Sequence, residues 1–359
     1  ASQITVPDAI GAIGRGRSVL IAGDSQQMPP TSFLNVTQNE EDLAADFQVL
    51  PDEESILTEA VMTQVPRLWL SWHYRSRDES LIAFSNEQYY DNRLLTFPAV
   101  PGRGHDSGVT FHRVQGQFIR TGADQGALRT NPAEAAAVVD EVLRRWRAGE
   151  RSLGVVTFNI QQRALIERML IDSGDADLAS ALLARDDGVF VKNLENVQGD
   201  EREVVIFSTG FSAGANGVLP LNFGPLNRSG GERRLNVAVT RARRRVMVFS
   251  SFEPEDLRVD ETSSVGIAHL RRYLELAKNG TGTLGRGVVT VRADRHRDQI
   301  AERLRERGLA VEVGLGLSEF SIDLAVGLPG EPPTLAVLLD SPQWARRLTV
   351  TDRDALPES

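Results

Sequence analysis

The stretch that decides the fold of this chain is RRLNVAVTRAR at residues 233–243, which leads into the apolar segment VMVFS at residues 246–250. The first part predicts a helix over 235–243 with cations at set places, and the second part predicts a short buried strand. On a solvated helix face, glutamates usually balance the arginines. Here no acidic residue follows Glu232 within the stretch. Guanidinium groups keep their charge and pair with phosphate oxygens. The stretch therefore fits either a phosphate-contacting helix or a solvated basic face.

Outward from this stretch, short apolar segments alternate with amphipathic ones. Helices are expected at 79–89, 132–147 and 160–172, besides the one at 235–243, and strands at 68–70, 109–114, 154–158, 189–192, 204–208 and 246–250. A helix at 6–13 and a strand at 18–22 precede them. Short buried strands separated by helices indicate a parallel sheet covered by helices on both faces, and Asn131 before Pro132 is typical of a helix N-cap. The expected fold class is α/β.

A second and smaller pattern follows a glycine- and threonine-rich segment at residues 280–287, a composition typical of a boundary. It comprises an expected strand at 288–291, a charged helix at 297–307 that ends at Gly308, and strands at 310–313, 321–326 and 334–339. This order predicts a separate, smaller α/β module.

The bulk composition excludes several classes of protein. The 359 residues include 41% hydrophobic and 25% charged residues, which is ordinary for a soluble globular chain. The chain has no cysteine, so disulfides and thiolate metal sites are excluded. No apolar run has membrane-spanning length and no signal peptide is recognisable, so we expect a cytoplasmic location and no membrane partner. With a net charge of -9, any nucleic-acid surface must be a local patch.

Three further polar segments stand out beside the expected strands. GDSQQMPP at 23–30 follows the expected strand at 18–22, HYRS at 73–76 follows the one at 68–70, and QGDE at 198–201 precedes the one at 204–208. Each segment alone is compatible with an ordinary turn or an aromatic cap. Each also has a possible role in a nucleotide site, and residues 23–30 follow a strand, where α/β sheets bind ligands.

The residue types in these segments suit separate parts of a nucleotide. Gln27 suits a group that senses a terminal phosphate or orients water. Tyr74 suits stacking on a base, and Arg75 suits a phosphate contact. Gly199 permits close backbone approach, and Glu201 can accept a hydrogen bond from a ribose hydroxyl.

In this order, with residues 233–243 last, the four segments resemble motifs III, IV, V and VI of superfamily 1 helicases. The branch is the one that contains the nonsense-mediated-decay helicase and its DNA-acting bacterial relatives. The resemblance spans residues 1–252 and implies a RecA-like sheet, ATP and Mg²⁺ as cofactors, single-stranded nucleic acid as partner and 5′ to 3′ movement.

The resemblance also implies roles for individual residues. The expected catalytic residues are Gln27 at the γ-phosphate and Arg75 and Arg241 as arginine fingers. Tyr74 is expected to stack on adenine and Glu201 to hold the ribose, within a nucleotide-binding set of Asp24, Tyr74, Gln198, Gly199, Glu201 and Arg234. Contacts to the nucleic-acid strand are expected from Pro29, Thr157 and Asn193. Here the chain departs from the family, since residues 157–159 read TFN where relatives often have TPY, and a threonine is usual at 193.

Two parts of an ATP site are missing from the sequence. No Gly-x-x-x-x-Gly-Lys-Ser/Thr phosphate loop occurs, since neither Lys192 nor Lys278 follows a glycine, and the Asp-Glu pair of motif II is absent. We therefore expect residues 1–45 to be the end of a first motor domain that is otherwise missing, 46–280 a second motor domain and 281–359 a truncated further module. The chain alone is expected to hydrolyse no ATP. The strand at 18–22 is expected to be mobile or borrowed by another chain, because its sheet partners are missing.

Asp323 and Asp340 accompany two strands of the small module. Such aspartates are either ordinary edge residues near turns or carboxylates that hold Mg²⁺ in a nuclease. Residues 288–354 resemble the restriction-endonuclease-like domain related to very-short-patch repair nucleases, which implies that Asp323 and Asp340 are metal ligands. The stretch 352–354, DRD, also matches. Relatives carry a glutamate where this chain has Leu338, and an apolar side chain cannot ligate a hard cation. We expect a weakened or inactive nuclease that serves as a DNA-binding element.

Three functions remain open from sequence. The chain is the motor half of an ATP-dependent helicase on single strands, a metal-dependent DNA nuclease with a degenerate motor, or a non-catalytic nucleic-acid-binding scaffold. The retained arginines favour the motor, Leu338 counts against the nuclease, and the nuclease-like module favours DNA as the track.

Overall fold

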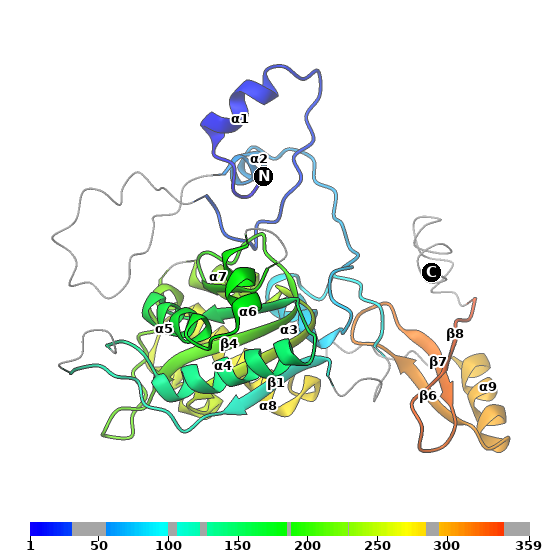
Figure 1. The fold of residues 1–359 in the computed structure, drawn as a ribbon. Coiled ribbons are helices and arrows are strands. Elements are labelled where there is room, and N and C mark those ends of the chain that lie inside the picture. Colours follow the sequence, from blue (N-terminus) through cyan, green and yellow to red (C-terminus); the bar gives the residue numbers. More distant parts are fainter. Residues whose placement is uncertain are drawn as a thin grey trace.

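The computed structural model describes residues 1–30, 55–99, 106–122, 128–184, 188–228, 230–284 and 294–340. Its largest feature is a five-stranded sheet in the order β1-β5-β4-β2-β3, in which every pairing is parallel (Figure 1). The strands are β1 (Gly108–Arg113), β2 (Leu153–Thr157), β3 (Phe190–Asn193), β4 (Arg202–Ser212) and β5 (Ala242–Ser251). The expected RecA-like parallel α/β sheet is confirmed.

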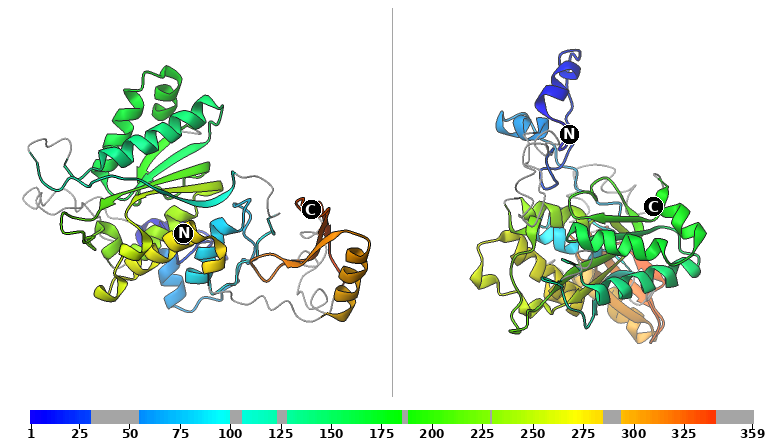
Figure 2. Two further views of the ribbon diagram at one scale, coloured as in Figure 1. Left: turned by 90° about the horizontal axis from the view of Figure 1, so that it is seen from below. Right: turned by 60° about the vertical axis from the view of Figure 1, so that its left-hand side comes forward.

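Helices cover both faces of this sheet (Figure 2). One face packs against α4 (Pro132–Arg147), α5 (Ile160–Ile171) and α6 (Ala176–Leu183), and the other against α3 (Ser80–Tyr89), α7 (Gly231–Val239) and α8 (Val265–Asn279). Successive residues of β4 explain the two layers: Val204 and Ile206 pack toward α4 and α5, and Val205 and Phe207 toward α7 and α8. A strand buried on both faces reads as a continuous apolar run for this reason.

The start of α4 follows the expected local rules. The side chain of Asn131 accepts a hydrogen bond from the backbone N–H of Glu134, and Pro132 occupies the first helical turn. Arginines in the last turn complement the helix dipole. The helix has the expected bounds.

Several expected elements are wrong. Residues 18–22 and 68–70 form no strand, and Leu20 and Leu68 are 91% and 92% exposed. An apolar run forms a strand only where a neighbour offers hydrogen-bond partners, and the order of the five-stranded sheet does not include these segments. Whether 18–22 is mobile or pairs with another chain stays a prediction.

The helix expected at 235–243 begins and ends earlier, as α7. Gly230, at a φ of 78°, starts it, and it ends at Val239. Arg241 lies in the turn that follows, and Arg243 lies in β5. The reason is spatial: the chain must leave the helix to enter the sheet between β1 and β4.

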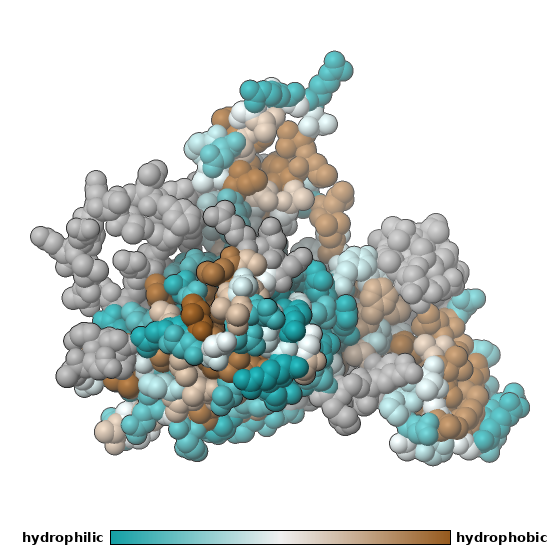
Figure 3. All heavy atoms as spheres, in the orientation of Figure 1, coloured by the Kyte–Doolittle hydropathy of each residue, from teal (hydrophilic) through white to brown (hydrophobic). Residues whose placement is uncertain are grey.

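The N-terminal part contributes α1 (Val6–Ile13) and α2 (Ile56–Met62), which contact each other. The backbone N–H of Ile56 donates to the carbonyl of Ile4 at 2.9 Å. Ile10 and Met62 are 61% and 68% exposed, and Figure 3 shows apolar atoms gathered over this region. Residues 35–54, whose acidic and poorly periodic sequence predicts a surface loop or a short helix, lie outside the described residues.

The smaller module contains α9 (Arg295–Glu306) and an antiparallel sheet of β6 (Ala310–Leu315), β7 (Ile322–Gly327) and β8 (Leu335–Val337), in that order. Ala301 of α9 packs on Leu324 and Val326 of β7. The expected strand at 288–291 and the stretch 352–354 lie outside the described residues. Short 3-10 turns occupy 224–227, 254–256, 259–261 and 281–283. Within the described ranges, no helix is both long enough and apolar enough to span a bilayer.

Candidate active site

Three segments far apart in the sequence meet at the amino ends of β4 and β5. Glu201, directly before β4, accepts a hydrogen bond from Nε of Arg75 at 2.7 Å on one carboxylate oxygen and one from Arg243 on the other. These two arginines, Arg243 more than Arg75, hold the pKa of Glu201 below its usual range. The backbone N–H of Arg77 donates to the carbonyl of Arg243 at 2.7 Å. Arg75 and Arg243 therefore both engage Glu201 directly.

Arg241 is a buried cation at the end of α7. Its Nε donates to the carbonyl of Val237 at 2.7 Å and its Nη2 to the hydroxyl of Thr240 at 3.0 Å. Burial, and then the neighbouring Arg75, lower the pKa of Arg241 to about 10, so it stays charged at neutral pH. In the described part of the chain no carboxylate lies within ion-pair distance of this guanidinium. A buried cation without a carboxylate partner is costly, which suits a site that receives an anionic ligand.

The loop at 23–30 is anchored to this region through Asp24. The carboxylate of Asp24 accepts hydrogen bonds from Nε2 of Gln27 at 3.0 Å and from the hydroxyl of Tyr90 at 2.7 Å. Nδ2 of Asn236, on α7, donates to the carbonyl of Gln26 at 2.9 Å. Burial and Asp24 raise the pKa of Tyr90, so its hydroxyl remains a donor. Gln27 is thereby held beside α7. The strand expected before it, at 18–22, does not form.

His73 shapes the turn that carries Arg75. Its Nε2 accepts from the backbone N–H of Ser76 at 3.2 Å and lies 2.9 Å from the Ser76 hydroxyl. Burial, then Arg75 and Arg241, lower the pKa of His73 to about 4, so the imidazole is neutral and free to accept.

Tyr74 presents its ring to solvent beside two other aromatic side chains. It is 63% exposed and lies 6.5 Å from Trp72 and 6.4 Å from Phe97 between ring centroids. An exposed ring of this kind is available to stack on a planar ligand.

The loop before β4 contains the other expected nucleotide-binding residues. Gly199 has a φ of 92°, and the space where a Cβ would stand is open, so the backbone can be approached closely there. Oε1 of Gln198 is buried with no hydrogen-bond partner among the described residues. Arg234 is buried on α7, with its Nε 3.5 Å from a carboxylate oxygen of Glu195.

The expected nucleic-acid residues lie elsewhere. Thr157 and Asn193 are paired in register at the carboxyl ends of β2 and β3, on the opposite edge of the sheet from Glu201. Thr157 is fully buried, and its hydroxyl donates to the carbonyl of Asn159 at 2.8 Å. Pro29 is half-buried in the anchored loop. The structure does not bring these three together, and their strand contacts stay a prediction.

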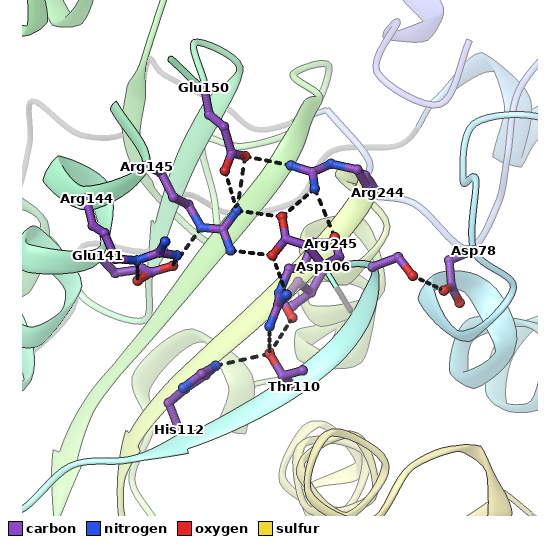
Figure 4. Close-up of polar contacts among 12 residues, drawn as sticks. Asp78, Asp106, Thr110, His112, Glu141, Arg144, Arg145, Glu150, Arg244 and Arg245 are labelled. Atoms are coloured by element: carbon purple, nitrogen blue, oxygen red, sulfur yellow. Dashed lines mark hydrogen bonds and ion pairs between the residues drawn. The ribbon is translucent and has the colours of Figure 1, made fainter. Parts of the chain in front are cut away.

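An ion-pair network supports the same amino edge (Figure 4). Asp106, before β1, accepts from Arg145 of α4 and from Arg244 and Arg245 of β5, and Glu150 also pairs with Arg145 and Arg244. These arginines, Arg145 above all, hold the pKa of Asp106 below its usual range. The network ties β1, β5 and α4 together next to Arg243.

Sequence reasoning missed four groups of this site: His73, Tyr90, Asn236 and Arg243. Asn236 carried a signal, because it is a polar residue inside the apolar run LNVAV. Tyr90 carried none, since its place beside Asp24 depends on how the loop docks.

In the small module, Asp323 lies in β7 and Asp340 follows β8. Oδ2 of Asp323 accepts from the backbone N–H of Leu339 at 2.8 Å. Within the part of the chain that the structure describes, no three metal-binding side chains lie close enough to share an ion.

Known proteins support the motif resemblance. A family model described as an AAA domain matches residues 53–253. An uncharacterized ATP-dependent helicase of Mycoplasma genitalium is 34% identical over 299 residues, which cover 78% of this chain and 25% of that protein. DNA polymerase alpha-associated DNA helicase A of Saccharomyces cerevisiae is 24% identical over 261 residues, covering 66% of this chain and 34% of that protein. The chain thus spans only a quarter to a third of the length of these relatives.

Among solved structures, the C-terminal domain of a possible DNA helicase from Lactobacillus plantarum aligns with a TM-score of 0.29 and 14% identity, covering 55% of this chain and 92% of that one. The family model spans more than half of the chain and every strand of the main sheet. The chain therefore belongs to the AAA domain family.

Proposed function

We propose that this chain supplies one wall of the ATP site in an ATP-dependent superfamily 1 helicase or translocase that moves along single-stranded DNA. The observation that carries the proposal is the convergence of Arg75, Arg241 and Glu201 beside Asp24 and Gln27. These residues come from the loop at 23–30, the segment at 73–76 and the positions directly before β4 and β5. If these side chains only formed a solvated surface, nothing would require segments so far apart in the sequence to meet.

Each group has a role that its surroundings support. The buried Arg241 and the half-buried Arg75 stabilise charge that develops on a transferred phosphoryl group. Tyr74 stacks on the adenine, and Glu201 accepts from the ribose. Gln27, held by Asp24, contacts the terminal phosphate. The open backbone at Gly199 and the unpartnered Oε1 of Gln198 fit a ligand at the loop before β4.

The other wall belongs to a first motor domain with a phosphate loop and the acids that hold Mg²⁺. Neither motif occurs in this sequence, and the relatives are three to four times longer than the matched region. In this division residues 1–45 end the first motor domain, 46–280 form the second and 281–359 form the appended module. The exposed apolar side chains of α1 and α2 suit a surface covered by that domain.

The test is ATP hydrolysis by the complete protein with and without single-stranded DNA or RNA. Arg241→Ala is expected to lower kcat by about 10³-fold. Arg233→Ala, on the helix α7 that precedes Arg241, is the matched control and should leave kcat within about twofold. Stimulation by DNA but not RNA supports the assigned track. Hydrolysis by the 359-residue chain alone, lost in Arg241→Ala, would contradict the proposed division of the site.

For the small module we propose a restriction-endonuclease-like origin and a DNA-binding role without cleavage. The carboxylate of Asp323 is engaged by the backbone of Leu339, and Leu338 occupies the place of a metal-binding glutamate. Incubation of the complete protein with plasmid DNA and Mg²⁺ or Mn²⁺ should yield no cleavage. Cleavage abolished by Asp323→Ala would favour the nuclease function instead.

A further inference from the structure

The small module touches the proposed nucleotide site through one short segment, Gly316–Phe320, between β6 and β7. Figure 1 and the left view of Figure 2 show this loop reaching the chain that precedes β1. The contacts are buried and specific, and the proposed ATP mechanism does not use them.

The first contact is a carboxylate that bridges the two parts. Glu79, beside the start of α3, is 5% exposed and accepts from the backbone N–H of Leu317 at 3.1 Å. The hydroxyl of Thr96 donates to the same carboxylate. Burial raises the pKa of Glu79, and these hydrogen bonds oppose that rise. A buried carboxylate held this way fixes the position of all its donors.

The second contact is made by Ser318, which is 3% exposed. Its hydroxyl accepts from the backbone N–H of Thr96 at 3.0 Å and donates to the carbonyl of Phe320 at 3.2 Å. The module therefore holds the backbone of Thr96 directly, through Ser318, and its side chain only indirectly, through the Glu79 carboxylate that Leu317 also engages.

The third contact is aromatic. The ring of Phe320 lies 5.3 Å from Trp72 and 6.0 Å from Phe97, and Trp72 stacks on Phe97 at 5.0 Å. Tyr74 joins this group through Trp72 and Phe97. The exposed ring assigned to adenine thus rests on rings that the module helps to hold.

The backbone completes the connection. The N–H of His73 donates to the carbonyl of Leu95 at 2.9 Å, and the N–H of Leu95 donates to the carbonyl of Ser71 at 2.8 Å. Leu95 precedes Thr96, which the module holds. A shift of Gly316–Phe320 therefore acts on Tyr74 and Arg75 through both the backbone and the rings.

We propose that Gly316–Phe320 is a positioning latch: the small module sets the nucleotide affinity of the motor by holding the base-stacking segment Trp72–Ser76. The inference rests on the proposed function and adds a role for the module that is separate from binding DNA. Phe320 is a positioning residue that acts through Trp72 on Tyr74. Energetic coupling of this kind requires that two contacting residues be non-additive when both are changed.

The test is a double-mutant cycle in the complete protein, read out as the Kd of a fluorescent ATP analogue. Phe320→Leu keeps apolar volume but removes the ring, and it should weaken binding by about fivefold or more. In a Tyr74→Ala background the same substitution should have no further effect. Leu328→Ala, at a 56% exposed position in the turn after β7, is the matched control and should leave the Kd unchanged.

Ser318→Ala provides a second variant that reports through Thr96, and it should also weaken binding. The thermal midpoint of each variant distinguishes loss of fold from loss of positioning. Full affinity in both Phe320→Leu and Ser318→Ala would overturn the latch alone, as would an equal effect of Phe320→Leu with and without Tyr74. No ATP binding by the unsubstituted protein would overturn the proposed function together with the latch.

Discussion

Arg75 and Glu201 are 126 positions apart in the sequence, yet Nε of the arginine donates to Oε2 of the glutamate at 2.7 Å. Arg243 engages the other oxygen of the same carboxylate. A phosphate that reaches this edge competes with Glu201 for Arg75, because both are anionic acceptors for the same guanidinium. The pair therefore marks the point where ligand-free and nucleotide-bound arrangements should differ.

If Glu201 accepts from the ribose, its loss should matter only for nucleotides with ribose hydroxyls. Glu201→Gln is expected to lower the affinity for ATP by about tenfold, since a charged acceptor is lost, and to leave the affinity for dideoxy-ATP unchanged. The matched control is Glu203→Gln. Glu203 lies two positions after Glu201 in the sequence and pairs with Arg77. Equal losses for ATP and dideoxy-ATP would exclude the ribose contact.

Arg241 is expected to contribute to ATP turnover and not to the stability of the fold. Arg241→Met removes a buried cation that has no carboxylate partner among the described residues, so the free energy of unfolding should stay the same or rise by about 1 kcal/mol. ATP turnover by the complete protein should be lost. Denaturant unfolding and the ATPase rate measure the two effects. A destabilisation of more than about 2 kcal/mol would mean that the guanidinium is mainly structural.

The ion-pair network around Arg145, in contrast, is expected to contribute to the stability of the fold. Arg145 is 1% exposed and pairs with Asp106, Glu141 and Glu150, so Arg145→Met removes three ion pairs of a buried guanidinium and should cost about 3 kcal/mol. Arg144→Met is an ideal control, because Arg144 is 61% exposed and also pairs with Glu141. It should change stability by less than about 1 kcal/mol. Similar unfolding midpoints for the two variants would contradict a structural role for the network.

Glu134 should make stability depend on pH near neutrality. It is fully buried between α4 and the carboxyl ends of β4 and β5, where it accepts from the N–H of Gly210 at 2.6 Å and the hydroxyl of Ser208 at 2.8 Å. Burial raises its pKa to about 7, against these bonds. Since the folded pKa lies above the unfolded value, the folded state binds the proton more tightly. The stabilisation from that proton is full below the unfolded pKa and declines as pH rises toward 7.

The measurement is the free energy of unfolding at pH 5 and pH 8 for the unsubstituted chain and Glu134→Gln. The unsubstituted chain should lose on the order of 3 kcal/mol more than the variant between these pH values. Parallel pH profiles for the two proteins would show that Glu134 is not the titrating group.

The elements that sequence predicted well are those whose signals are local. The bounds of α1 and α4 follow from caps, prolines and spacing of apolar residues, and the apolar runs of β1, β4 and β5 reflect burial on both faces. The helix α8 was missed although Ile267, Leu270 and Leu274 have helical spacing, so the signal was present. The strand expected at 68–70 does not form. A short apolar run does not show whether a neighbouring strand is available to pair with it.

The candidate site divides in the same way. By itself the sequence determined which residue types are suited to bind phosphate, base and ribose, because guanidinium, aromatic and carboxylate chemistry belongs to each side chain wherever it lies. It also determined that the main sheet is parallel, since buried strands alternate with helices along the chain. Only the tertiary structure decided that Glu201 pairs with Arg75 and Arg243, that Tyr90 holds Asp24, and that Phe320 supports the rings beside Tyr74. Those contacts join segments separated by tens to hundreds of residues, and their geometry depends on how whole elements pack, which no local pattern records.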